Sequence, residues 1–199
     1  MYMDDVLNDF SSLLAKRLEK RVYTTEDAIR YTFFYSLINK SEIDISDIIL
    51  EYPHPYIKKA EIDTYVYPNN LTQGLVVEFK YDRQMPSGHS SPRPQKAGKL
   101  FNDIYRLSKF DTTEGMRLLF IYVTDNEMAK YLKNPRNGLI GFFELPLGST
   151  IIIDDDFITT KSQTFKNGIS GTINKSVKCV MKESLPNNHE LRIYEVMNF

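Results

Sequence analysis

The stretch AEIDTYVYPNNLTQGLVVEFKYDR, residues 60–83, decides the fold that the sequence predicts. Apolar and polar residues alternate on both sides of the polar segment PNNLTQ, which is typical of two half-buried strands joined by a turn. In the second strand, LVVEFKY, alternation brings Glu78 and Lys80 onto one face. The first strand contributes Asp63. The predicted hairpin therefore carries three charged side chains in an otherwise apolar ribbon.

Burial of one face fixes the register of such a hairpin, because a slip of one residue would turn the whole apolar set outward. We expect Ile62 and Val66 to share the core side with Val77. Asp63 then lies on the other side together with Glu78, and a symmetric turn places these two acids directly opposite one another. Facing carboxylates repel by up to about 1 kcal/mol, and by more where they are desolvated. The hairpin therefore predicts a compensating cation.

Lys80 supplies one positive charge, and a hard divalent cation such as Mg²⁺ is the second candidate, because it binds carboxylate oxygens and retains water. A metal, a bound water and an ammonium group are the parts that phosphodiester hydrolysis requires. In this interpretation Asp63 and Glu78 hold the metal, and Lys80 orients or deprotonates the attacking water and neutralises the transition state. For the triplet alone, a solvated strand face with ordinary alternating charges is the other interpretation.

These residues resemble the signature of the PD-(D/E)xK nuclease superfamily, also called the restriction-endonuclease-like fold. That signature is an acid on one strand and acid-x-Lys on the next, and the matching positions are Asp63 and the EFK segment with Glu78 and Lys80. The resemblance implies a core of a helix, an antiparallel meander, a crossover helix and a strand parallel to the third strand. Residues 24–124 fit that order.

The resemblance also implies further site residues. The first helix of the family often supplies another acid near the metal, which corresponds to Glu26 in TTEDAIR, with Asp27 as the rival. Gln95 in PQKAGK corresponds to a glutamine found early in the crossover helix of exonuclease-like branches. The departure is Ile62, which stands where the family name has proline. Residues 125–199 match no named pattern.

Periodicity predicts the other elements. Helices are expected over 3–20, from Thr24 or Thr25 to about Lys40, over 94–110 with Pro94 first, and over 126–134; strands are expected over 47–52, 116–125, 149–157, 177–184 and 191–198. Strand, helix and strand in succession imply a parallel crossover.

The predicted fold class is α/β: a single domain with a restriction-endonuclease-like mixed β-sheet flanked by helices. Residues 1–22 form an N-terminal helix that packs on the domain or on a partner. Residues 23–199 form the nuclease-like domain, with the core at 24–124 and a β-rich C-terminal elaboration.

Composition excludes several classes of site. With one cysteine and three scattered histidines, the 199-residue chain has neither an internal disulfide nor zinc-ligand spacing. We expect Cys179, inside the apolar segment VKCVMKE, to be a buried inert thiol rather than half of a catalytic Cys/His pair. No apolar run approaches the roughly 18 residues of a membrane span, and the N-terminus lacks a secretory pattern. We therefore expect a cytoplasmic protein with no membrane partner.

The net charge of −1 argues against bulk attraction to nucleic acid, but residues 80–109 form a basic island. In the nuclease interpretation, polar side chains around the site contact the phosphate backbone of DNA. They are Lys58, Arg83, Arg93, Gln95, Lys96, Lys99 and Arg106. Each taken singly is also compatible with an ordinary solvated side chain. The acids at 154–156 indicate a solvated acidic turn after a strand rather than a second metal site.

The sequence thus predicts a Mg²⁺-dependent deoxyribonuclease, with Mn²⁺ as a substitute metal. A homodimer is expected, since cutting both strands of a duplex takes two sites related by a two-fold axis. Restriction or another genome-defence role follows by analogy only. The alternative is a catalytically inactive nucleic-acid-binding or assembly module on the same scaffold. A hydrolase of small phosphorylated molecules is a third option, which requires a closed pocket.

Overall fold

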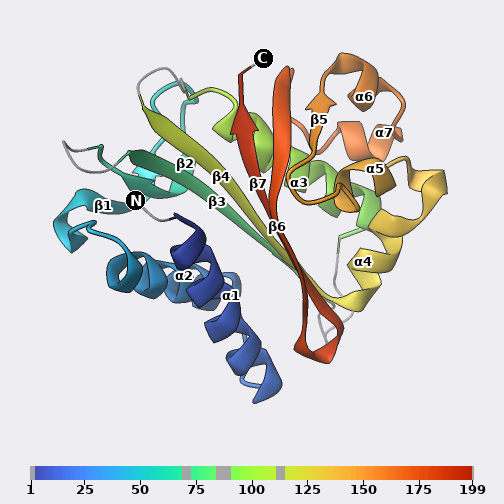
Figure 1. Ribbon diagram of the computed structural model, residues 1–199. Helices are drawn as coiled ribbons and strands as arrows, with labels where there is room; N and C mark the ends of the chain where they lie inside the picture. The colour runs from blue at the N-terminus through green and yellow to red at the C-terminus, as the bar shows by residue number, and fades with distance from the viewer. Residues whose placement is uncertain (1–2, 69–72, 84–90, 111–114, 199) are drawn as a thin grey trace.

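A single mixed β-sheet organises the protein. The computed structural model describes residues 3–68, 73–83, 91–110 and 115–198. The sheet has seven strands in the order β1-β2-β3-β4-β7-β6-β5 (Figure 1). The strands are β1 (Ile48–Pro53), β2 (Glu61–Val66), β3 (Gly74–Asp82), β4 (Met116–Thr124), β5 (Thr150–Ile153), β6 (Lys175–Leu185) and β7 (His189–Met197). The pair β3–β4 is parallel and the other neighbouring pairs are antiparallel. The α/β class and the single domain are therefore confirmed.

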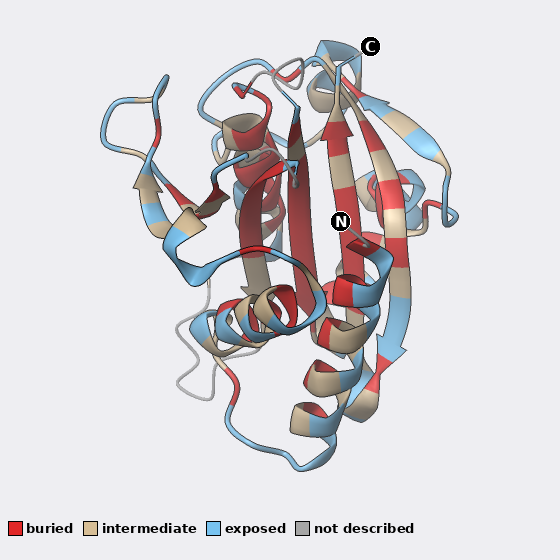
Figure 2. Cartoon of the chain, turned by 60° about the vertical axis from the view of Figure 1, so that its left-hand side comes forward, coloured by how far each residue is buried: buried red, intermediate tan, exposed pale blue. Residues whose placement is uncertain are grey.

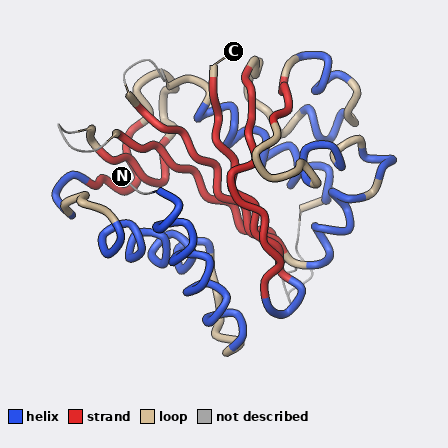
Figure 3. Tube along the Cα trace, viewed as in Figure 1, coloured by secondary structure: helices blue, strands red, loops and turns tan. Residues whose placement is uncertain are grey.

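Helices cover both faces of the sheet, as Figure 3 shows. The helices are α1 (Met3–Glu19), α2 (Glu26–Lys40), α3 (Arg93–Leu107), α4 (Asn126–Lys133), α5 (Ile140–Phe143), α6 (Asp155–Thr159) and α7 (Gln163–Lys166). One hydrophobic core lies under α1 and α2, and a second lies on the opposite face under α3 to α7. The central strands β3 and β4 are buried almost throughout, as the red strands in Figure 2 show.

Local signals explain the longer helices. Thr25 is the N-cap of α2, where its hydroxyl accepts from the Ala28 N–H at 3.1 Å, and acids occupy the first turn. The helices expected over 3–20, 24–40, 94–110 and 126–134 are confirmed, as is the parallel crossover through α3. Pro94 is the second residue of α3 rather than the first, because the helix begins at Arg93.

Short elements in the second half of the chain differ from prediction. The strand expected over 149–157 ends at Ile153, because Asp154 caps α6 by accepting from the Phe157 N–H at 2.8 Å. Residues 155 and 156 are exposed to solvent as predicted, but they lie in the first turn of a helix. Helices of four or five residues leave too few periodic positions to be recognised in the sequence.

The hairpin has the predicted register. Thr64 pairs with Val77 and Val66 with Leu75, which is the register that brings Asp63 next to the ladder end at the level of Glu78, one residue beyond the last pair. The expectation that Ile62 shares the core of Val66 is wrong, because Ile62 packs in the core under α3 and Val66 in the core under α1 and α2. The β2–β3 ladder ends at Thr64, and beyond this point Ile62 pairs with β1 alone.

Candidate active site

The candidate site lies where β2 leaves β3. The β2–β3 ladder ends at Thr64 and Val77, whereas β3 continues beside β4 to Asp82. Two carboxylates take the place of the missing strand at the β3 edge. Asp63 Oδ2 accepts from the Phe79 N–H at 2.7 Å, and Glu26 Oε2 accepts from the Tyr81 N–H at 2.7 Å. We call this divergence of the strands, together with its two carboxylates, the fork.

Lys80 lies between Phe79 and Tyr81, the two residues whose N–H groups these carboxylates accept from. Its ammonium donates to Glu26 Oε2 at 3.1 Å, and both side chains are partly buried. Burial acts to lower the pKa of Lys80, but the charges of Glu26, Asp103 and Asp82 outweigh it, so the pKa is raised. Lys80 is therefore a cation at neutral pH, which suits orientation and charge neutralisation and does not suit deprotonation of a water.

Glu78 is completely buried, and Arg106 of α3 binds both of its oxygens. Arg106 Nε lies 2.7 Å from Oε1 and a terminal nitrogen 2.8 Å from Oε2. Burial raises the pKa of Glu78 well above its usual range, against the opposing effect of the Arg106 guanidinium. The solvated-face interpretation is therefore wrong for Glu78, because its charge lies in the interior and needs a partner.

Asp103 completes this buried cluster from α3. It lies 3.0 Å from Arg106, one turn along the same helix. Burial raises the pKa of the Asp103 carboxyl to about 7, and the charges of Asp63 and Glu26 add to that effect. Helix α3 thus presents a carboxyl group and a guanidinium group together toward β3.

Arg30 of α2 approaches the fork from the other face. Its guanidinium lies 3.1 Å from Asp27, 3.5 Å from Glu51 and 3.5 Å from Asp63 Oδ1, with only 10% of the Arg30 side chain exposed. Asp27 is 63% exposed and contacts Arg30, so Glu26 is the α2 acid that reaches Lys80.

Asp82 and His54 are two further buried polar residues near the fork. Asp82 is buried at the end of β3, where the Tyr122 hydroxyl donates to it at 3.1 Å and burial raises its pKa. His54 Nδ1 accepts from the N–H groups of Tyr56 and Ile57, both at 3.1 Å, so its Nε2–H donates to the Arg106 carbonyl at 3.0 Å. The segment after β1 is thereby tied to the end of α3.

Of the residues that we expected to contact DNA, Arg83, Arg93 and Lys96 line one small hollow. Arg106 belongs to the buried cluster. Lys96 donates to the Arg83 carbonyl at 3.3 Å, and Arg93 pairs with Glu127 at 2.9 Å. The others are Lys58 and Lys99, which are exposed, and Gln95, which is half-buried. Arg83 itself lies over the Tyr23 ring.

Arg30 and Asp103 were missed as site residues. A signal for each was present in the helical pattern. Asp103 lies three residues after Leu100 and four before Leu107, within the apolar stripe of its helix, and Arg30 lies three residues before Phe33. A charge inside an apolar stripe requires a buried partner.

The carboxylates around the fork are oxygen donors of the kind that a divalent cation binds, and they outnumber the neighbouring cations by one. Four carboxylates face three cations around the fork; they are Glu26, Asp63, Glu78 and Asp103 against Arg30, Lys80 and Arg106. Both Glu78 oxygens are held by Arg106, so a metal reaches Glu78 only when Arg106 turns away. In the described ranges no three His, Cys, Asp or Glu side chains are grouped as metal ligands.

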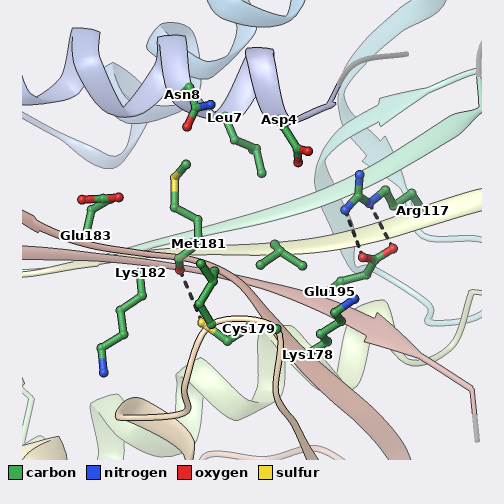
Figure 4. Close-up of a pocket in the computed structure, with 13 residues that line it drawn as sticks. Asp4, Leu7, Asn8, Arg117, Lys178, Cys179, Met181, Lys182, Glu183 and Glu195 are labelled. Atoms are coloured by element: carbon green, nitrogen blue, oxygen red, sulfur yellow. Dashed lines mark hydrogen bonds and ion pairs between the residues drawn. The ribbon is translucent and has the colours of Figure 1, made fainter.

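A hollow of about 500 Å³ lies elsewhere, between α1 and the β6–β7 side of the sheet. In Figure 4, Asp4 and Leu7 line it from α1. On its other side an ion pair joins Arg117 to Glu195 at 3.0 Å, and Cys179 is a buried free thiol, as predicted. Among the described residues, its lining has no fully buried carboxylate comparable to Glu78, so the fork is the better candidate for chemistry.

Comparison with known proteins adds no assignment: no family model, no curated protein and no solved structure matches the chain. Among the described residues, no helix has the length and apolar character to cross a membrane.

Proposed function

We propose that the protein is a Mg²⁺-dependent nuclease of the PD-(D/E)xK type that hydrolyses phosphodiester bonds in DNA. One observation carries the proposal: where the β2–β3 ladder ends, Asp63 accepts from the N–H of Phe79, the residue after Glu78, and Lys80 and Glu26 are in contact beside them. Asp63, Glu78 and Lys80 match the family signature, and Glu26 is the further acid that the resemblance implies. The element order α2, β1–β2–β3 meander, α3 and parallel β4 also supports the restriction-endonuclease-like fold.

Each side chain has a role consistent with its position. Asp63 and Glu78 would hold Mg²⁺, and the chemistry that bound Mg²⁺ supplies is polarisation of the phosphoryl oxygen and a lower pKa for a coordinated water. Lys80, held as a cation by Glu26, orients that water and neutralises charge in the transition state. Glu26 positions Lys80 through the 3.1 Å contact and holds the β3 edge.

Arg106 has two states in this proposal. Without metal, its guanidinium neutralises Glu78 in a fully bidentate pair. A metal at Glu78 would require the guanidinium to leave that carboxylate, and the guanidinium would then be free to bind a phosphate, which is the role expected for it from the sequence. The Arg106 side chain is 26% exposed, so it already reaches the surface.

One observation favours the second candidate, a catalytically inactive nucleic-acid-binding module. Every carboxylate at the fork already has a cationic or N–H partner within the chain. A site stabilised in this way folds without metal. The two candidates therefore differ in whether Mg²⁺ binds and whether DNA is cut.

Incubation of supercoiled plasmid with protein and Mg²⁺ or Mn²⁺ separates the candidates. We expect nicking by the unmodified protein, loss of more than about 99% of it in Lys80→Ala, and little change in Lys130→Ala. Lys130 is a suitable control, because it lies on α4 with 63% of its side chain exposed. Nicking that survives Lys80→Ala contradicts the mechanism, and absence of nicking on all DNA substrates supports the binding module.

A further inference from the structure

A second hollow lies next to the fork, at the connection between α1 and α2. It has a volume of about 330 Å³. Its lining comes from the α1–α2 connection, the end of β3 and the β6–β7 turn: Leu18, Arg21, Val22, Tyr23, Thr24, Tyr81, Arg83, Asn187 and His189. We call it the tyrosine pocket.

Tyr23 forms an exposed wall that is nevertheless held in place. The residue is 68% exposed, while the Arg83 guanidinium lies 4.4 Å from the centre of its ring and donates to its hydroxyl. Arg17 donates to the Tyr23 carbonyl at 2.7 Å. A fixed aromatic ring with this much open surface offers a stacking platform at a low entropic cost.

Tyr81 and His189 form the opposite, more rigid wall. His189 Nδ1 lies 3.2 Å from the Pro186 carbonyl and 3.1 Å from the Asn187 carbonyl, so this nitrogen carries the proton. His189 Nε2 then accepts from the Tyr81 hydroxyl at 3.0 Å. Both rings are therefore fixed by hydrogen bonds before any ligand arrives.

The tyrosine pocket adjoins the fork through the chain itself. Tyr81 directly follows Lys80, and its N–H is the group that Glu26 holds. Thr24 precedes Glu26 by two residues. At a rise of about 3.3 Å per strand residue, the pocket begins within about 10 Å of Lys80. A few nucleotides of a strand cover that distance.

We propose that the tyrosine pocket binds an unpaired nucleobase of the nucleic acid whose phosphate lies at the fork. This inference rests on the proposed function and adds a preference for single-stranded or unpaired segments. The lining has two guanidinium groups and, among the described residues, no carboxylate, so it complements a polyanion. Flat π surfaces beside Arg83 suit a base better than they suit an acidic peptide, because every base offers a π face.

Fluorescence of 2-aminopurine tests this directly. A single-stranded oligonucleotide with one 2-aminopurine is titrated with protein in EDTA, so that binding is measured without cleavage. We expect the fluorescence to be quenched on binding by the unmodified protein and by Tyr23→Phe, which keeps the ring. Tyr23→Ala should lose the quenching and bind about tenfold more weakly. Tyr35→Ala removes an equally accessible tyrosine, 58% exposed on α2, and should behave as the unmodified protein.

Oligonucleotides with an abasic position complete the test. The unmodified protein should bind a set of abasic oligonucleotides more weakly than their parents, whereas Tyr23→Ala should not distinguish them. AMP that binds as tightly as the oligonucleotide would overturn a polynucleotide site in favour of a mononucleotide site. Equal binding by the unmodified protein and Tyr23→Ala, or no oligonucleotide binding, overturns the pocket.

The same measurements keep the two proposals apart. Base-dependent binding without plasmid nicking would contradict the nuclease proposal and support the base-binding role of the tyrosine pocket. Suppose instead that nicking depends on Lys80, and that oligonucleotide binding is unaffected by Tyr23→Ala and by abasic positions. This result would contradict the base-binding role of the tyrosine pocket and support the nuclease proposal.

Discussion

Arg106 binds Glu78 through two parallel hydrogen bonds of 2.7 Å and 2.8 Å, and Glu78 is wholly buried beneath it. Such a pair contributes little net stability when intact, since desolvation of the two ions offsets their attraction. Removal of one partner is costly, because the other charge is then left buried and unpaired. Arg106 therefore controls the stability of the fork and, in the proposed nuclease, the access of a metal to Glu78.

The first prediction concerns stability. Arg106→Gln should lower the free energy of unfolding by about 3 kcal/mol at pH 7, since Glu78 loses its partner. Glu78→Gln in the same chain should recover most of that loss, because the buried charge is then gone. Urea unfolding measures all three proteins.

Arg117→Gln is the matched control for this comparison. Arg117 binds Glu195 in the same bidentate way, at 3.0 Å for each bond, but 22% of the Glu195 side chain is exposed. We expect a loss of about 1 kcal/mol there, as for other partly exposed pairs. Equal losses in the two variants would contradict the importance of burial at Glu78.

The second prediction concerns the metal. In the unmodified protein Mg²⁺ must compete with Arg106 for Glu78, so Arg106→Gln should bind Mg²⁺ at least about tenfold more tightly. Isothermal titration calorimetry measures the affinity, and the thermal midpoint of Arg106→Gln should rise further with Mg²⁺ than that of Arg117→Gln. Unchanged affinity in Arg106→Gln means that Glu78 is not a metal ligand.

The third prediction concerns the start of α2. Thr25→Ala removes the side chain that accepts from the Ala28 N–H, and should cost about 1 kcal/mol of stability. Thr25→Ser keeps the oxygen and should cost much less. Because Glu26 follows directly, plasmid nicking should fall more in Thr25→Ala than in Thr25→Ser. Equal nicking by the two variants would show that the cap does not position Glu26.

Features fixed by local sequence patterns could be predicted, and features fixed by packing between distant elements could not. The register of the hairpin, which pairs Thr64 with Val77, was predictable, because hydrophobic alternation fixes it locally. The place of Ile62 was not, since it depends on where the β2–β3 ladder ends. The pairing of Arg106 with Glu78 was also missed, because it joins α3 to β3 through packing that no sequence spacing encodes. Short helices such as α5 lack a readable period.

The last prediction concerns pH. Burial raises the pKa of Asp103 to about 7, whereas in the unfolded chain the carboxyl has its ordinary pKa of 3.8. Between about pH 4 and pH 7 the folded state therefore holds a proton that the unfolded state has lost, so the Asp103 contribution to stability falls as pH rises through this window and is constant above it. Asp103→Asn removes the titration. Urea unfolding should show that the free energy of unfolding of Asp103→Asn, relative to that of the unmodified protein, rises by a few kcal/mol between pH 4.5 and pH 7.5. Asp27→Asn is the control, because 63% of the Asp27 side chain is exposed, and it should show no such rise. Parallel pH curves for Asp103→Asn and the unmodified protein would mean that Asp103 is ionised throughout, with Arg106 and Lys80 compensating its charge fully.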